Sequence, residues 1–155
     1  IMANYCIFGV NGAMIKLSKS EDQKNKFLHK YDPAVAKEIS DAQYLAASQD
    51  TLTLYLEEDV VKEMSNQTYD SNRPDETDSE RDARWKETFE EELNYQKYKV
   101  GHYVDFTSDA PAEWVAYKNN LNSVNVDNVT FPIESFQKWF NSQSGYSQLT
   151  MWELP

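Results

Sequence analysis

The chain has 155 residues, of which 40% are hydrophobic and 14% aromatic, and its formal net charge is −11. This length is typical of one domain, and the apolar content is sufficient for a core that needs no metal or disulfide. The negative charge and the lack of a basic stripe exclude direct nucleic-acid binding, and no apolar run is long enough to span a membrane.

A β-hairpin is predicted at the start of the chain. Asn11-Gly12 separates two apolar runs, "YCIFGV" and "AMIKL". This dipeptide favours the positive φ angles of a tight turn. We therefore expect strands at 4–10 and 13–17.

Two helices are predicted after this hairpin. Ser18 or Ser20 can cap the first, whose opening turn is acidic, and the helix is expected to end near Tyr31. Asp32-Pro33 then predicts the start of a second helix, with the aspartate as cap and the proline at the first helical position.

The middle of the chain predicts a strand, a short helix and a loop. "TLTLYLEE" (51–58) alternates apolar and polar residues and indicates a half-buried strand. "EEDVVKEM" (57–64) begins with three acids and predicts a short helix. Residues 65–80 contain no aliphatic side chain, so they predict a polar, mobile loop.

Helical spacing returns at about residue 78. Trp85, Phe89 and Leu93 recur every four residues and predict a helix over 79–94. "KYKVGHYVDF" (97–106) alternates and predicts a strand.

The last third predicts a second clear helix and several short elements. Trp114, Tyr117 and Leu121 form one stripe of a helix that contains Pro111 in its first turn. The remaining segments predict a strand or irregular hairpin over "VNVDNVTF", a short helix over "PIESFQKWF" and a final strand over "YSQLTMWEL".

This order of elements favours an α+β fold: a single domain over 1–155, with a mostly antiparallel sheet and several helices packed mainly on one face. Hairpin signals are mixed with helices, and no repeated βα unit occurs. Neither a GxGxxG nor a GxxxxGK[ST] motif is present, so the sequence predicts no nucleotide cofactor.

Candidate catalytic and metal-binding residues are few. Cys6 lies in an apolar strand and is expected to be a core residue, because a nucleophilic thiol needs an exposed, electropositive setting. His29 and His102 show no zinc-ligand spacing. A single cysteine cannot form an internal disulfide, and no signal peptide is visible, so the expected location is cytoplasmic. No catalytic residue, cofactor or metal ligand is predicted.

Negative charge is concentrated in one segment. Residues 57–92 contain fourteen acids and five bases, whereas residues 1–56 contain six of each. A strong field of this sign attracts basic surfaces. The candidate partner-binding residues are Glu57, Glu58, Asp59, Asp75, Glu76, Asp78, Glu80, Asp82, Glu87, Glu90 and Glu91, with Glu92 beside them.

The leading hypothesis is a small acidic binding protein, not an enzyme, that neutralises or regulates a basic protein partner. Immunity proteins, phage anti-defence inhibitors and nucleic-acid mimics act in this way. One alternative is a hydrolase with two carboxylates in a cleft, whose pKa values would be separated. Another is a structural or assembly subunit, which would show a large apolar patch. The common explanation for such a charged segment is an ordinary solvated surface.

Overall fold

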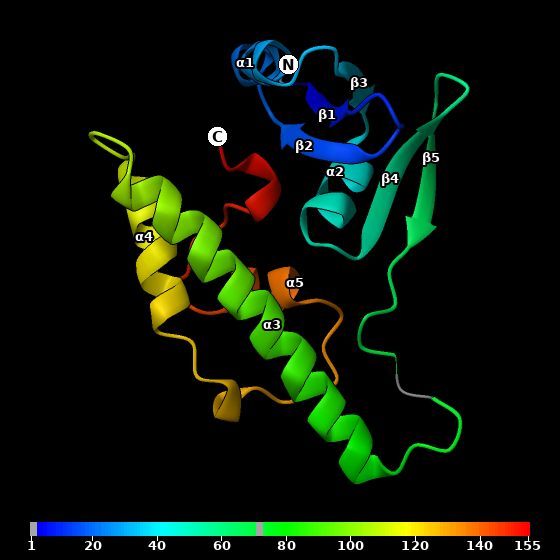
Figure 1. Ribbon diagram of the computed structural model, residues 1–155, viewed down its shortest axis with the longest axis vertical. Coiled ribbons are helices and arrows are strands. Elements are labelled where there is room, and N and C mark those ends of the chain that lie inside the picture. The colour runs from blue at the N-terminus through cyan, green and yellow to red at the C-terminus, as the bar shows by residue number, and fades with distance from the viewer. Residues whose placement is uncertain (1–2, 71–72) are drawn as a thin grey trace. The chain divides into compact units, whose positions relative to one another are not determined.

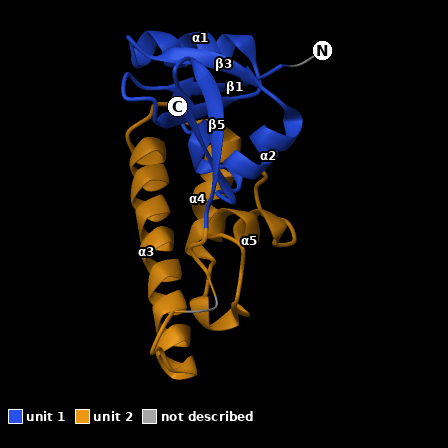
Figure 2. Ribbon diagram, turned by 90° about the vertical axis from the view of Figure 1, so that its right-hand side faces the viewer, with its two compact units in different colours: residues 1–66, 150–155 blue, residues 67–149 orange. Residues whose placement is uncertain are grey.

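Figure 1 shows the computed structural model of the chain, which describes residues 3–70 and 73–155. Those residues form five α-helices and two small antiparallel sheets, of three and two strands, which confirms the predicted α+β class. The chain consists of two compact units (Figure 2). The first combines residues 1–66 with 150–155, and the second is residues 67–149. The expected extent of one domain, residues 1–155, stays a prediction.

A three-stranded sheet with the order β2–β1–β3 is the centre of the first unit. β1 (Asn4–Phe8) pairs antiparallel with both β2 (Met14–Ser18) and β3 (Val35–Ile39). Helix α1 (Glu21–Lys30) packs against β1 and β2 and begins at Ser20, whose side chain accepts a hydrogen bond from the Gln23 backbone N–H. The predicted first helix is therefore confirmed.

The β1–β2 hairpin is also confirmed, but its turn differs from the prediction. Of Asn11 and Gly12, only Gly12 has a positive φ, 81°. The turn also approaches the next sheet, because the Leu56 backbone N–H donates to the Gly12 carbonyl at 2.8 Å. A Cβ atom on Gly12 would lie 2.3 Å from the Leu56 carbonyl oxygen, so this position requires glycine for two reasons.

The predicted helix from Asp32-Pro33 is wrong. Residues 35–39 form β3, in which Val35 pairs with Phe8 of β1. The helix starts later, as α2 (Asp41–Ser48), with Ser40 as the N-cap in a capping box with Gln43. Backbone pairing with β1 outweighs the local helix-start signal of an Asp-Pro pair.

The second sheet is the hairpin of β4 (Leu52–Glu57) and β5 (Val60–Ser65). The predicted strand is confirmed, and the predicted helix over 57–64 is wrong. Glu58 and Asp59 form the turn with φ angles of 50° and 64°. This is the backbone conformation of a tight hairpin turn, which usually carries Asn-Gly. Two acidic residues give no such sequence signal.

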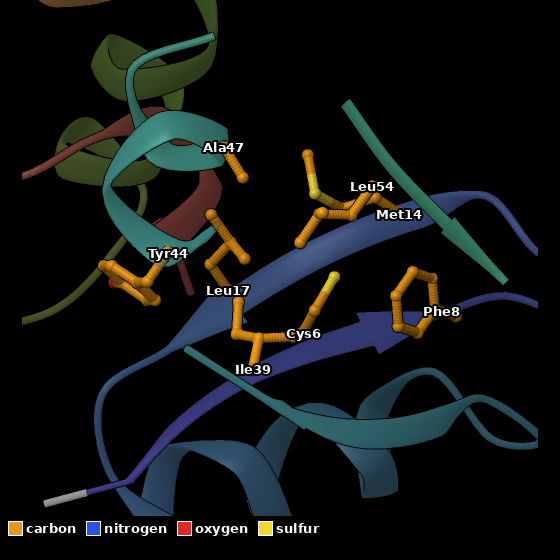
Figure 3. Packing of buried hydrophobic residues seen from close by; sticks show 8 residues of the cluster. All are labelled: Cys6, Phe8, Met14, Leu17, Ile39, Tyr44, Ala47 and Leu54. Atoms are coloured by element: carbon orange, nitrogen blue, oxygen red, sulfur yellow. The ribbon is translucent and has the colours of Figure 1, made fainter. Parts of the chain in front are cut away.

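An apolar cluster lies between the three-stranded sheet and the α2 and β4 elements (Figure 3). Its buried members are Cys6, Phe8, Met14, Leu17, Ile39, Tyr44, Ala47 and Leu54. The chain end returns to this cluster as a 3₁₀ turn, η2 (Met151–Glu153), where a strand was predicted. Trp152 packs against the cluster and donates its indole N–H to Asp50 at 2.7 Å.

The second unit is helical. Helix α3 (Asp78–Asp105) is one continuous element of 28 residues, so the strand predicted over 97–106 is wrong. α4 (Ala112–Asn122) and α5 (Phe136–Ser142) both contact it (Figure 1). Residues 126–128 form a 3₁₀ turn, η1 (Val126–Asn128), instead of the predicted strand or irregular hairpin. The predicted stripe of α4 is confirmed, because its three aromatic and leucine members are buried.

Aromatic rings form much of the core of the second unit. Phe89 of α3 contacts Phe136 and Trp139 of α5, with ring centroids 4.9 and 5.1 Å apart. Phe131 contacts Phe89 at 5.9 Å and stacks on Tyr69 at 5.8 Å. Tyr69 therefore anchors part of the segment predicted as a loop. Residues 71–72 of that segment lie outside the described residues, and its mobility stays a prediction.

A buried polar network joins the three helices. The Tyr117 hydroxyl of α4 donates to Gln96 Oε1 of α3 at 2.6 Å. Gln96 Nε2 donates to Gln137 Oε1 of α5 at 3.1 Å, and Gln137 Nε2 donates to Asn141 Oδ1 at 3.1 Å. All four side chains are buried. These hydrogen bonds fix the orientation of α3 within its unit, because a buried amide tolerates few other arrangements.

Candidate partner-binding surface

The predicted acidic residues fall into two groups, one in each unit. Glu57, Glu58 and Asp59 form the exposed end of the β4–β5 hairpin in the first unit. The other candidates, from Asp75 onward, belong to the second unit and lie before α3 or on its first four turns. Each group is a local acidic surface, and their union into one continuous surface stays a prediction.

The hairpin group is partly neutralised. The ammonium nitrogen of Lys37, on β3, lies 2.8 Å from the Asp59 carboxylate. Exposed pairs of this kind are screened by solvent and contribute little stability, but they reduce the local negative field. Glu57 and Glu58 form no ion pair among the described residues.

Two acids of the second group stabilise the start of α3. Thr77 is the N-cap: its hydroxyl accepts from the Glu80 backbone N–H, and the Glu80 carboxylate accepts from the Thr77 backbone N–H. Asp78 lies in the same first turn, where negative charge interacts favourably with the helix dipole. For Asp78 and Glu80, local helix stability is therefore a sufficient explanation.

Arginines neutralise other members of this group. Arg84 donates from Nε and Nη2 to both carboxylate oxygens of Glu76, at 2.8 and 2.9 Å. This hydrogen-bonded pair lowers the pKa of Glu76 below its ordinary value. Arg81 lies 3.3 Å from Asp78 and 3.1 Å from Asp82. The negative charges of these carboxylates are therefore neutralised by arginines of the same chain.

Glu87, Glu90 and Glu91 differ from these acids. All three are exposed on α3, and within residues 3–70 and 73–155 none of them forms an ion pair. Residues three and four apart share a helix face, so Glu87 lies beside both of the others. The buried stripe that includes Phe89 and Leu93 holds the opposite face of α3 in the core. This geometry presents three carboxylates outward on a rigid element.

The Glu92 side chain points towards the core and not outward. It is partly buried, and its carboxylate accepts a hydrogen bond from Gln96 Nε2 at 3.1 Å. Burial raises the pKa of Glu92 above its ordinary value, because the charged form loses hydration. Glu92 therefore belongs to the polar core network and not to the outward acidic face.

The structure also bears on the other chemistries considered. Cys6 is fully buried, and burial raises the pKa of its thiol far above the ordinary value, so it is not poised as a nucleophile. Glu76 and Glu92 are carboxyls with shifts in opposite directions. The Glu76 carboxylate is bound by Arg84. The Glu92 carboxylate accepts from Gln96 instead.

Within the described part of the chain, no group of three histidine, cysteine or acidic side chains could hold a metal ion. None of the helices described there combines the length and the apolar character that a membrane crossing requires. Comparison with protein families, curated proteins and solved structures finds no match for this chain.

One surface feature was missed from the sequence. One face of the predicted strand over 97–106 was expected to carry Tyr98, Val100, His102, Val104 and Phe106. In the structure, Tyr98 and His102 on α3 and its C-cap residue Phe106 are exposed. Val100 is fully buried and Val104 is half-buried. Side chains four residues apart share a face in both a strand and a helix, so their spacing alone does not distinguish the two.

Proposed function

We propose that this protein is a non-enzymatic binding protein that docks a basic protein partner on the outward acidic face of α3. This outward acidic face consists of Glu87, Glu90 and Glu91. The proposal is supported by one observation above all: these carboxylates are exposed, adjacent and without ion pairs among the described residues. Bonds to Arg84, to Arg81 or within the helix cap hold four nearby acids, by contrast: Glu76, Asp78, Glu80 and Asp82. Asp75 is exposed but precedes α3, so it lies outside this face.

Electrostatics gives this face two roles in binding. Unpaired surface carboxylates keep their long-range field, which steers a cationic partner during diffusion. Because the helix is anchored by its buried stripe, the carboxylates need little reorganisation on docking, and the entropic cost of binding is reduced. Occupation of the partner's basic site would then block that site, as an immunity-type or anti-defence inhibitor does.

A charge-reversal experiment tests the proposal. The triple variant Glu87→Lys, Glu90→Lys, Glu91→Lys keeps good helix formers at each position, so α3 is expected to remain folded. The wild-type chain and the variant would each be immobilised and exposed to lysate of the encoding organism at about 50 mM and about 500 mM salt. The captured protein would be identified by mass spectrometry and its Kd measured with purified components.

The matched control reverses three acids elsewhere, by Asp22→Lys, Glu38→Lys and Glu113→Lys. These residues are also exposed and form no ion pair within the described residues, and the change in net charge is identical. We expect the α3 variant to weaken binding at least about tenfold more than the control, and high salt to weaken wild-type binding. Equal affinities for the two variants, or a Kd that ignores salt, would show that this face is not the interface.

A further inference from the structure

Exposed aromatic rings form a second feature of the outward side of α3. Tyr95, Tyr98 and Phe106 are 50%, 70% and 79% exposed. His102 lies between the last two, with its ring centroid 4.7 Å from that of Phe106 and 6.2 Å from that of Tyr98. Tyr98, His102 and Phe106 therefore form a continuous run of rings, and Tyr95 lies three residues before Tyr98 on the helix. We call Tyr95, Tyr98, His102 and Phe106 the aromatic stripe.

The fold does not need these rings for its core. The buried face of α3 is complete without them, and Val100 fills the core at this level. Another aromatic residue of the same helix, Tyr103, packs against Trp114 of α4 with ring centroids 6.2 Å apart. Single exposed apolar side chains are common on protein surfaces, whereas a run of rings in mutual contact indicates an interaction surface.

The aromatic stripe continues the outward acidic face along one side of the helix. Glu87, Glu91, Tyr95, Tyr98 and His102 follow one another at spacings of four, four, three and four residues. Such spacing keeps side chains on one face of an α-helix. From residue 87 to residue 106 this combined surface is roughly 30 Å long, which is the length of a helix of about 20 residues.

We propose that the aromatic stripe is the apolar anchor for the basic partner, and that the partner contributes an amphipathic, arginine-bearing helix. This inference rests on the proposed function. Tyrosine and other aromatic residues supply most of the energy at the centre of many interfaces, whereas rim charges mainly set the rate of association and the salt dependence. Arginine suits both parts of the surface, because it pairs with carboxylates and stacks on aromatic faces.

The chain itself provides an example of this stacking. The Arg81 guanidinium lies 4.8 Å from the centroid of the Trp85 ring, next to its carboxylate partners Asp78 and Asp82. A partner arginine would meet the same combination of ring and carboxylate on the outward side of α3. The net charge of −11 opposes the alternative occupant, a second copy of this chain.

Two synthetic peptides of about 20 residues test the inference with the full-length chain. The first is an amphipathic helix with arginine on one face and leucine on the other. The second has the same arginines but glutamine in place of every leucine. We expect the amphipathic peptide to bind the wild-type chain at least about tenfold more tightly than the polar peptide in calorimetric titration.

The double variant Tyr98→Ala, Phe106→Ala is expected to abolish this preference, because it removes the apolar contact for leucine. The affinity for the polar peptide should fall less, because the carboxylates still bind its arginines. Leu45→Ala is the matched control, since Leu45 is 58% exposed on α2, and it should retain the preference. A preference that survives in the double variant would overturn the inference. So would light scattering that shows a wild-type dimer converted to a monomer by this variant, because the stripe would then bind a second copy.

The charge-reversed α3 variant separates this inference from the proposed function. If it loses affinity for both peptides but the double variant keeps the preference, the acidic face binds cations and only the aromatic anchor is wrong. If it binds the polar peptide as tightly as the wild-type chain does, the outward acidic face is not a cation-binding surface, and both proposals fail. Circular dichroism of each variant confirms that α3 is intact.

Discussion

In the first unit, strand alternation and a hairpin place small and aliphatic side chains such as Cys6, Leu17 and Leu54 in the core. In the second unit, the core instead combines aromatic rings with side-chain amides, as in the contacts of Phe89 and the hydrogen bonds of Gln137. Apolar packing tolerates substitutions of similar volume, whereas buried amides require partners at defined positions. The second unit therefore has the more narrowly specified interior, and it carries the proposed docking helix.

The ring cluster is expected to give the largest effect. Phe89→Ala removes a fully buried ring that contacts Phe131, Phe136 and Trp139, so the free energy of unfolding should fall by about 3–5 kcal/mol. Urea unfolding followed by tryptophan fluorescence measures this loss. Leu54→Ala is the counterpart in the first unit, with an expected loss of about 2–5 kcal/mol. A loss below about 1 kcal/mol for Phe89→Ala would be inconsistent with a close-packed ring cluster.

The amide network is expected to give an intermediate effect. Gln137→Leu keeps a similar volume but removes the amide that bonds Gln96 and Asn141, so buried polar atoms lose partners at a cost of about 1–3 kcal/mol. Ser48→Ala, which removes one hydroxyl bonded to the Leu45 carbonyl in the first unit, should cost about 1 kcal/mol or less.

A double-mutant cycle sharpens this prediction. Gln96→Leu combined with Gln137→Leu should destabilise the protein less than the sum of the single substitutions, because the partners are removed together. The coupling is measured from urea unfolding of the four proteins. Additivity within about 0.3 kcal/mol would mean that these two amides act independently.

Two glutamates of the second unit should give the smallest effects, with opposite signs. The pKa of Glu92 is raised in the folded protein, so folded Glu92 binds its proton more tightly than the unfolded chain does. Ionisation therefore destabilises the fold as pH rises through this range. Glu92→Gln should stabilise the protein at pH 7, and the difference should vanish at acidic pH.

Glu76→Gln is the matched control. The pKa of Glu76 is lowered by Arg84, so its carboxylate contributes stability above the unfolded pKa, and this contribution is lost as pH falls through the folded pKa. The substitution should destabilise the protein at pH 7 and have no effect at strongly acidic pH. Thermal unfolding from pH 3 to pH 8 compares the three proteins, and shifts of the same sign for both substitutions would contradict these assignments.

Local signals predicted several elements correctly. Asn11-Gly12 marked the first hairpin, Ser20 capped α1, and the four-residue spacing from Trp85 marked α3. Each of these signals acts over a few residues of chain, so no distant partner was needed to interpret it. The acidic segment was also visible, but the sequence could not separate the outward Glu87 from the inward Glu92, since this depends on what α3 packs against.

The sequence by itself determined the α+β class, the concentration of negative charge between residues 57 and 92 and the existence of most helices. Tertiary structure decided that 35–39 and 60–65 are strands, because their backbones pair with β1 and β4, and that α3 continues through 97–105. It also decided which acids are neutralised and which rings are exposed. These outcomes depend on contacts between residues far apart in the chain, and a local pattern of polar and apolar residues does not encode such contacts.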